Sequence, residues 1–214
     1  LILKGEVPEL KSFGTHDEVI FSIEKKSLRN LPEIGLDEAS HGHPLNQKEI
    51  TRLRALNLSH QRINLHLSDP DHEAKLRQSS TEAHKLGINL ETALFLSNDA
   101  EAELQAFVEL LEQIKPPIAT WLIFHKGEIS TSEKWILLAR KYLQKYDFNI
   151  KIGSGTNVLF TDLNRSTPSF EDMDIVCYSI NPQVHAFDNL SLIETLSAQP
   201  ETVKSARQFS NNKF

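Results

Sequence analysis

The feature that most constrains the fold is a repeat in which a short apolar segment precedes a longer amphipathic one. The apolar segments begin near positions 33, 59, 88, 118, 148 and 173, a period of about 25–30 residues, which leaves room for one helix between successive strands. A chain that returns to the same edge of a parallel sheet needs such a crossover. The repeat therefore predicts six βα units of a parallel sheet.

The expected boundaries follow from apolar periodicity and from cap residues. Asn98 and Asp99 resemble a helix N-cap, and Gly87 suits a helix C-terminus. After the fifth strand, we expect a long loop to residue 170. The expected strands cover residues 32–39, 60–67, 88–96, 118–125, 149–153 and 174–180, and the expected helices cover 45–57, 68–87, 98–113, 132–145 and 189–209.

Two architectures contain such units, a TIM barrel and a doubly wound open sheet. No glycine-rich phosphate-binding motif follows the first strand, which counts against a nucleotide-binding Rossmann domain. Polar residues end nearly every strand instead of gathering at one switch point, and this favours an α/β (β/α)8 TIM barrel over residues 32–214. A full barrel has eight units, so we expect an incomplete barrel that lacks strands seven and eight. Residues 1–31 hold two strand-like runs and are expected to form a short β segment.

The composition limits the kinds of binding partner that we expect. A formal net charge of −6 with no basic run counts against a nucleic-acid or anionic-membrane surface. No apolar run is long enough to span a bilayer and no secretory signal is seen, so we expect a cytoplasmic protein. The lone Cys177 lies in an apolar strand and is expected to be inert.

The sixth apolar segment leads into a polar loop that contains His185 and Asp188. A histidine oriented by a carboxylate is the usual general base for activating water, and a loop histidine bonded to backbone is the alternative. Asn181, Gln183 and Asp188 are expected to bind substrate. Pro182 ends the strand.

Glu91 lies in an otherwise apolar strand, where a carboxylate is costly to bury unless it is paired. Arg62 on the neighbouring strand is the expected partner, and a structural ion pair and a catalytic role both stay open. Arg62, Asn64 and His66 alternate with apolar residues and so share one face, which we expect to be the barrel interior.

Other candidates follow the remaining strands. His125 ends the fourth strand and is expected to face the barrel mouth, with Glu128 just after it. The glycines before Asn157 allow close backbone approach to a ligand. Asp162, Asn164 and Arg165 follow in the same loop, where Arg165 suits a carboxylate or an oxyanion; the alternative is that Asp162 and Arg165 only fix the loop. The first strand is followed by acids and histidines whose spacing fits no tight metal motif, so no metal is expected: Asp37, Glu38, His41 and His43.

Several segments together resemble the barrel domain of the D-apionate lactonase (D-apionolactonase) family, which is related in fold to clan-A glycoside hydrolases. They are GLDEASHGHPL, INLHLSDPD, ETALFL, IFHKGE, GSGTNVLFTDLNR, YSINPQVHAFD and SLIETLSAQPETVKSAR, and the resemblance runs from Pro32 to the end of the chain. It implies a β-rich module before the barrel, two further strands after residue 214, and hydrolysis of a sugar lactone.

Three functional classes follow. The first is a hydrolase of a sugar-derived lactone that uses base-activated water and a stabilised oxyanion, with a small carbohydrate as partner and no cofactor. The second is a clan-A glycosidase; there, Asn precedes the acid/base glutamate, whereas Gly127 precedes Glu128 here. The third is a non-catalytic carbohydrate-binding barrel. No G-x-S-x-G motif is present, which counts against a serine nucleophile. The expected catalytic residues are His185, His125, Glu128 and Glu91, and the expected substrate-binding residues are Arg62, Asn64, Asn157, Asp162, Asn164, Arg165, Asn181, Gln183 and Asp188.

Overall fold

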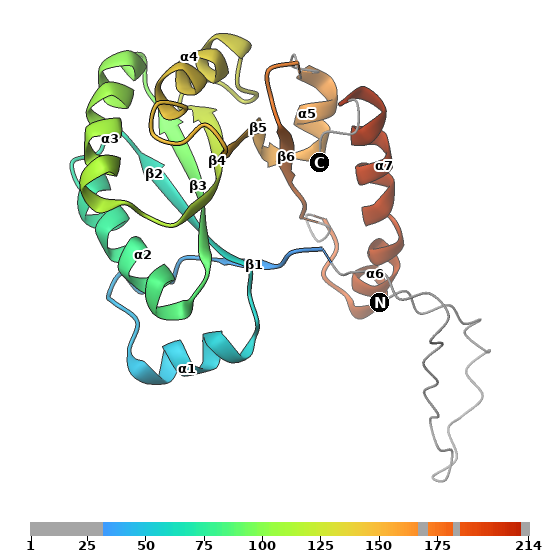
Figure 1. The fold of residues 1–214 in the computed structure, drawn as a ribbon. Helices are drawn as coiled ribbons and strands as arrows, with labels where there is room; N and C mark the ends of the chain where they lie inside the picture. The colour runs from blue at the N-terminus through green and yellow to red at the C-terminus, as the bar shows by residue number, and fades with distance from the viewer. Residues whose placement is uncertain (1–31, 167–170, 182–184, 211–214) are drawn as a thin grey trace, which may run out of the picture. The chain divides into compact units, whose positions relative to one another are not determined.

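Six parallel strands, paired in the order in which they occur along the chain, form the sheet on which the fold is built (Figure 1). The computed structural model describes residues 32–166, 171–181 and 185–210. The strands are β1 Gly35–Asp37, β2 His60–His66, β3 Asn89–Leu96, β4 Ile118–His125, β5 Lys151–Leu159 and β6 Ile175–Ser179. The helices are α1 Gln47–Ala55, α2 His72–Leu86, α3 Ala100–Ile114, α4 Glu133–Leu143, α5 Phe160–Ser166, α6 Asn189–Glu194 and α7 Gln199–Phe209, with the 3-10 helix η1 Thr195–Ser197 between the last two.

This arrangement confirms the predicted incomplete TIM barrel. Each strand pairs in parallel with the next, and each of the five crossovers contains a helix. The register places Asp37, Arg62 and Glu91 side by side on β1, β2 and β3. The β segment expected over residues 1–31 lies outside the described residues.

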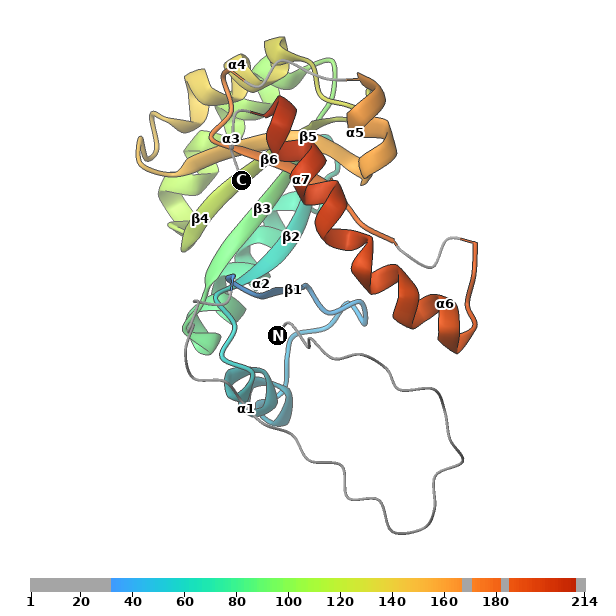
Figure 2. The ribbon, with the colours of Figure 1, turned by 90° about the vertical axis from the view of Figure 1, so that its right-hand side faces the viewer.

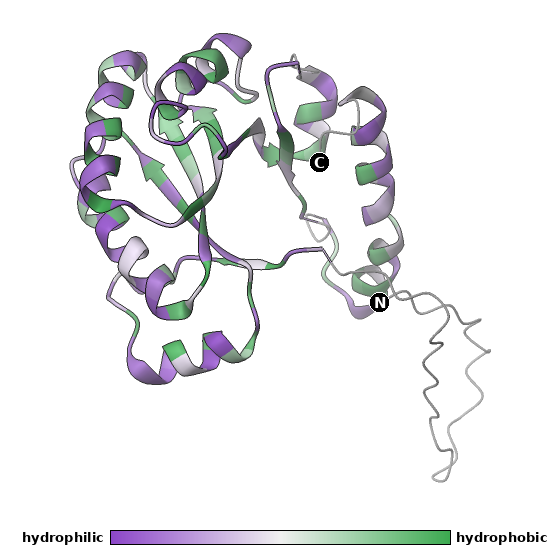
Figure 3. Ribbon diagram, viewed as in Figure 1, coloured by the Kyte–Doolittle hydropathy of each residue, from purple (hydrophilic) through white to green (hydrophobic). Residues whose placement is uncertain are grey.

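The main core lies between the sheet and the helices α2, α3 and α4, which cover one of its faces (Figures 1 and 2). Alternate strand residues such as Ile63, Leu94 and Trp121 are fully buried there. Phe107 of α3 meets Trp121 edge-on, with ring centroids 5.9 Å apart. The buried stripe of these helices is mainly hydrophobic, with Leu76, Leu104 and Ile136 fully buried, and hydrophilic residues alternate with it along each ribbon (Figure 3). Burial of this stripe, at about 25 cal/mol per Å² of apolar surface, holds the helices on the sheet.

Local signals in the sequence fix several helix ends. Asn46 and Glu49 form a capping box at the start of α1. Gly87 ends α2 with φ +73°, as predicted, because this left-handed conformation costs glycine little. Asp99 is the N-cap of α3 but makes no side-chain cap bond. Instead, Glu103 of the first turn accepts hydrogen bonds from the backbone N–H and the hydroxyl of Ser97.

Two predicted elements differ from the structure. The long loop expected after residue 153 is wrong, because β5 continues to Leu159 and α5 follows at once, with a register shift between Gly155 and Leu159. The single helix expected over residues 189–209 is divided into α6, η1 and α7. Pro200 lies in the first turn of α7, where its missing N–H does no harm; inside a continuous helix it would remove a backbone hydrogen bond.

The β6 side of the sheet carries less hydrophobic packing. Tyr178 of β6 bonds Thr202 of α7 through their hydroxyls at 3.1 Å. The large apolar side chains of α6 are mostly exposed: Leu190 is 65% and Ile193 68% exposed. No described helix is long and apolar enough to cross a membrane.

Candidate active site

The face of the sheet turned away from α2, α3 and α4 carries the polar side chains and is called the inner face below. On β2, Arg62, Asn64 and His66 are half-buried on this face, whereas Gln61, Ile63 and Leu65 are buried on the other, so the predicted alternation is confirmed. The inner face also has a small apolar cluster made of Ala93, Leu122 and Phe124, with Phe95 and Cys177 packed against it.

Arg62 is the centre of a polar cluster on the inner face. Its Nη1 lies 3.7 Å from Oε1 of Glu91, so the predicted ion pair is confirmed, and His60 Nε2 lies 3.9 Å from the other carboxylate oxygen. Arg62 Nη2 donates to Asn157 Oδ1 at 3.0 Å, and Arg62 Nε donates to Asn64 Oδ1 at 3.5 Å. The cluster thus joins three strands.

The Arg62–Asn157 hydrogen bond also reports the curvature of the sheet. β2 and β5 are separated by β3 and β4, so in a flat sheet they would be about 14 Å apart, at about 4.8 Å per strand. Their side chains meet at 3.0 Å because the sheet curls toward its inner face. The structure therefore brings together Arg62, Asn64, Glu91 and Asn157, as expected of a barrel interior.

A cleft of about 800 Å³ opens at the carboxyl ends of β1 and β2. Glu38 lies directly after β1 and forms an ion pair with Lys75 of α2 at 2.7 Å. It also accepts a hydrogen bond from the backbone N–H of Asn64 at 3.5 Å. Buried Glu82 accepts bonds from the Leu45 backbone N–H at 3.0 Å and from the Gln78 amide at 3.1 Å. The cleft lies where TIM barrels bind their ligands. Its lining includes Asp37, Glu38, Ser40, Asn64, Asp71, Lys75 and Glu82.

His66 ends β2 on the same face and was not among the predicted site residues. Its ring stacks on Phe95 with centroids 4.3 Å apart and planes 13° from parallel, and Phe95 in turn stacks on Phe124 at 5.2 Å. Burial lowers the pKa of His66, and the nearby Lys126 ammonium lowers it further. The signal was present in the sequence, because His66 alternates with Arg62 and Asn64.

His125 does not face the mouth, so that prediction is wrong. Inner-face positions on β4 are Leu122 and Phe124, which places His125 on the helix side. There it is 8% exposed and stacks on Trp135 of α4, with centroids 4.2 Å apart. Its Nδ1 accepts a bond from the Gly127 backbone N–H at 3.2 Å. A substrate on the inner face would not reach this imidazole.

Glu128 has a structural role at the start of α4. Its carboxylate accepts bonds from the Ser132 backbone N–H at 2.7 Å, the Ser132 hydroxyl at 3.0 Å and the Trp135 indole N–H at 2.8 Å. Burial alone would raise the pKa of this carboxyl, but the hydrogen bonds outweigh it and the pKa is lowered. A carboxylate that is ionised and accepts three hydrogen bonds is a poor proton donor. This argues against Glu128 as the acid of a glycosidase.

The other predicted site residues lie apart from the Arg62 cluster. Asp162, Asn164 and Arg165 lie on the short helix α5, not in a loop, and the last two are exposed. Asp188 is the N-cap of α6, accepting bonds from the Ser191 backbone N–H at 3.0 Å and hydroxyl at 2.7 Å.

The expected pairing of His185 with Asp188 is therefore not seen in the described part of the chain, where His185 is exposed and the Asp188 carboxylate caps a helix. Asn181 follows β6 and is also exposed. Gln183 lies outside the described residues.

No group of three or more metal-binding side chains occurs within the described ranges. His41 and His43 stack on each other with centroids 3.7 Å apart, and Glu38 is engaged by Lys75.

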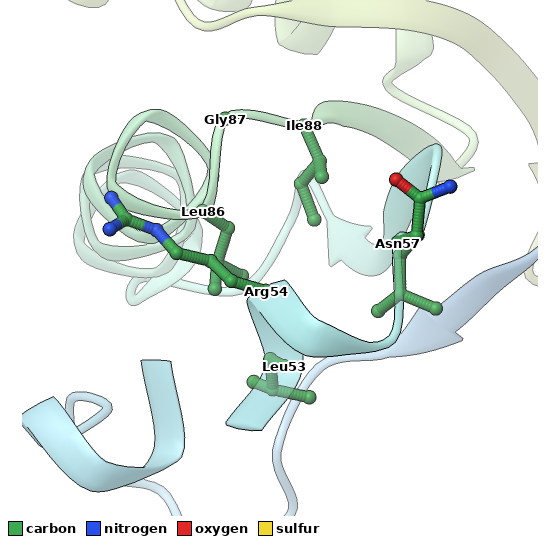
Figure 4. Close-up of a pocket in the computed structure, with 7 residues that line it drawn as sticks. Leu53, Arg54, Asn57, Leu86, Gly87 and Ile88 are labelled. Carbon is green, nitrogen blue, oxygen red and sulfur yellow. The ribbon is translucent and has the colours of Figure 1, made fainter. Parts of the chain in front are cut away.

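A second, smaller cavity of about 100 Å³ lies at the opposite ends of the strands, between the end of α1 and the end of α2 (Figure 4). Leu53, Leu86 and Ile88 line it, and the Arg54 guanidinium donates to the backbone carbonyl of Lys85. In TIM barrels this end contributes stability rather than chemistry. We therefore place the candidate site on the inner face at the carboxyl ends.

The match to a family model agrees with this fold. The model of a family described as D-apionate lactonase, TIM barrel domain, matches residues 34–213. A stretch of 65 residues is 40% identical to the D-apionate lactonase of Brucella anthropi and covers 30% of this chain but only 11% of that protein. A solved structure from a study of a monomeric dihydrodipicolinate synthase variant is 14% identical, with a TM-score of 0.40, over 84% of this chain and 61% of that one. The chain belongs to the D-apionate lactonase family and carries six βα units of its TIM-barrel domain.

Proposed function

We propose that this protein hydrolyses the ring ester of a sugar-derived lactone, such as D-apionolactone, on the inner face of the barrel. The observation that carries the proposal is the position of Arg62, a guanidinium held between Glu91 and Asn157 on the inner face. Family membership supports the reaction class, and the curled sheet supports the location.

The chemistry of lactone hydrolysis fits this arrangement. Water adds to the ring carbonyl, the carbonyl oxygen becomes an oxyanion, and the ring C–O bond then breaks to give a hydroxy acid. Arg62 supplies a fixed positive charge for the oxyanion and then for the carboxylate product. Its described hydrogen bonds use Nε and one Nη2 hydrogen, and the Nη1 contact with Glu91, at 3.7 Å, is longer than a hydrogen bond. Donors therefore stay available to a ligand.

Sugar hydroxyls also find partners nearby. Asn64 and Asn157 offer amide groups beside Arg62, and the cleft at the ends of β1 and β2 adds the Glu38 carboxylate and the Lys75 ammonium. A polyhydroxylated ring of five or six atoms fits a space lined in this way.

The glycosidase alternative gains no support from the inner face. It requires two carboxylates, one of them protonated, on either side of a glycosidic bond. Glu128 is bonded at the start of α4, and Glu91 is paired with Arg62.

The test is a comparison of substrates with the full-length natural protein. We expect hydrolysis of D-apionolactone or related sugar γ-lactones, followed by proton release, and no release of phenol from aryl glycosides. Arg62→Lys keeps the charge but loses the planar set of donors, so kcat/KM should fall by about 10–100-fold. Arg54→Lys, at the small cavity on the other side, is the matched control and should change little.

The outcomes separate the functional classes. Cleavage of aryl glycosides without lactone hydrolysis would favour the glycosidase. Binding of sugars without turnover would favour a carbohydrate-binding barrel. Unchanged lactonase activity of Arg62→Lys would remove Arg62 from the mechanism.

A further inference from the structure

We propose that His66 is the general base that activates water in this reaction, a role that rests on the proposed lactone hydrolysis. The inference begins from position. His66 is the last residue of β2 and lies on the inner face, four residues along the strand from Arg62, which is about 13 Å of backbone at 3.3 Å per residue. Arg62 and His66 lie on either side of Asn64 on the same face, which is where we place the bound lactone.

The ring of His66 is held in place by packing. One face stacks on Phe95 at 4.3 Å, nearly parallel, and Phe95 is itself backed by Phe124, which is 3% exposed. These three aromatic side chains come from adjacent strands and stack across the sheet. Stacking fixes the plane of the imidazole while leaving its nitrogen-bearing edge uncovered by this contact.

Neither ring nitrogen of His66 has a hydrogen-bond partner among the described residues. The other histidines of β2 and β4 differ in this respect. His60 Nδ1 bonds the Ser59 hydroxyl at 2.8 Å, and His125 is packed on the helix side. A base must accept a proton from water, so a ring nitrogen that no described residue bonds is what the reaction requires.

The charges around His66 favour its neutral form. Lys126, after β4, lies near the ring and forms an ion pair with Asp69 at 3.0 Å. Lys126 and Lys75 lower the pKa of His66, Asp69 and Asp71 raise it, and burial is the largest cause of the net decrease. The imidazole is therefore unprotonated at neutral pH and ready to accept a proton.

The proposed step is balanced. His66 takes one proton from water as the water oxygen bonds to the lactone carbonyl carbon. The tetrahedral intermediate then collapses, the ring C–O bond breaks, and the imidazolium returns the proton to the leaving alkoxide. One lactone and one water give one hydroxy acid, and His66 ends neutral.

The experiment compares pH profiles of kcat/KM on a sugar γ-lactone in the full-length natural protein. For the wild type we expect activity to rise with pH as His66 loses its proton, and the lowered pKa of His66 should place this rise below the usual range of histidine. Lys126→Met removes a neighbouring positive charge, so this acid limb should move to higher pH. Lys85→Met makes the same charge change at the far end of α2 and should leave the profile in place.

Replacement of the base gives the second arm. His66→Ala should lower kcat by about 10²–10⁴-fold, and added imidazole should restore part of the activity by occupying the space beside Phe95. Far-UV circular dichroism and the melting temperature confirm that the variant folds. An NMR titration of the imidazole protons of His66 gives its pKa independently of turnover.

Each result has one meaning. If the wild type hydrolyses no lactone, the proposed function fails and the role of His66 with it. If the wild type is active and His66→Ala keeps most of that activity, only the inference about His66 fails. Loss of activity in His185→Ala, with His66→Ala unaffected, would place the base in the loop after β6.

Discussion

Gly155 offers the sharpest test of the geometry that places Asn157. It pairs with Cys177 across β5 and β6 and has φ +144°, a conformation nearly restricted to glycine. A Cβ added at this position would lie within 3.0 Å of the Cys177 carbonyl oxygen and 3.2 Å from its amide nitrogen. Backbone atoms cannot rotate away, so the two strands would have to separate.

The expected cost of Gly155→Ala combines two terms. The backbone conformation costs an L-residue about 1–3 kcal/mol, and the steric overlap in a packed sheet costs about 1–3 kcal/mol more. We therefore expect a loss of about 2–6 kcal/mol in the free energy of unfolding. Asn157, two residues further on, should also shift away from Arg62, so lactone hydrolysis should weaken beyond what the loss of folded protein explains.

The assay is urea denaturation followed by circular dichroism. Gly42→Ala is the matched control, because Gly42 has φ +74° but nothing lies within 4 Å of an added Cβ. The control should lose only about 1–2 kcal/mol. Equal losses in the two variants would refute the reasoning, since the close approach of β5 to β6 would then contribute nothing.

Three further predictions concern other parts of the fold. Glu128→Gln should lose about 1–3 kcal/mol at neutral pH, because charged hydrogen bonds at the start of α4 are weakened; since the pKa of Glu128 is lowered from 4.5, the difference from wild type should disappear as the pH falls through that lowered pKa. Phe107→Ala, at a side chain 1% exposed, should lose about 3–5 kcal/mol, whereas Ile193→Ala, 68% exposed, should stay within about 0.5 kcal/mol; similar losses would contradict the assignment of the core. Desolvation raises the pKa of the partly buried Cys177 thiol to about 12, so iodoacetamide at pH 8 should modify it far more slowly in the folded protein than after unfolding, as mass spectrometry would show.

The architecture could be predicted because its signals are repeated and local. Apolar segments at a regular period gave the six strands and their order, and Gly87 marked a helix end through its own conformational freedom. The pairing of Arg62 with Glu91 followed from the cost of burying an unpaired charge. Each of these arguments uses a rule that acts within one strand or between two neighbouring strands.

Some of the differences lie where the sequence carries no such marker. β4 is apolar on both faces, so nothing in its sequence shows which face His125 takes, and only the packing of Trp135 settles it. The glycines near Asn157 resemble a loop, but they permit close pairing of β5 with β6. The helix-capping role of Asp188 could be predicted, because Asp is a favoured N-cap residue and α6 begins directly after it. The alternation of His66 with Arg62 and Asn64 shows its face, but its stacking partner Phe95 comes from another strand, so the sequence does not show that its ring is held in place.

The sequential strand order has a consequence for how the protein matures. During synthesis from the amino end, each new strand can join an edge already made by its predecessor. The core beneath α2 and α3 can therefore form early, but Arg62 gains its Asn157 partner only when β5 has emerged. The packing beneath α2 and α3 would thus precede the assembly of the proposed site, which is completed by a residue from the far side of the sheet.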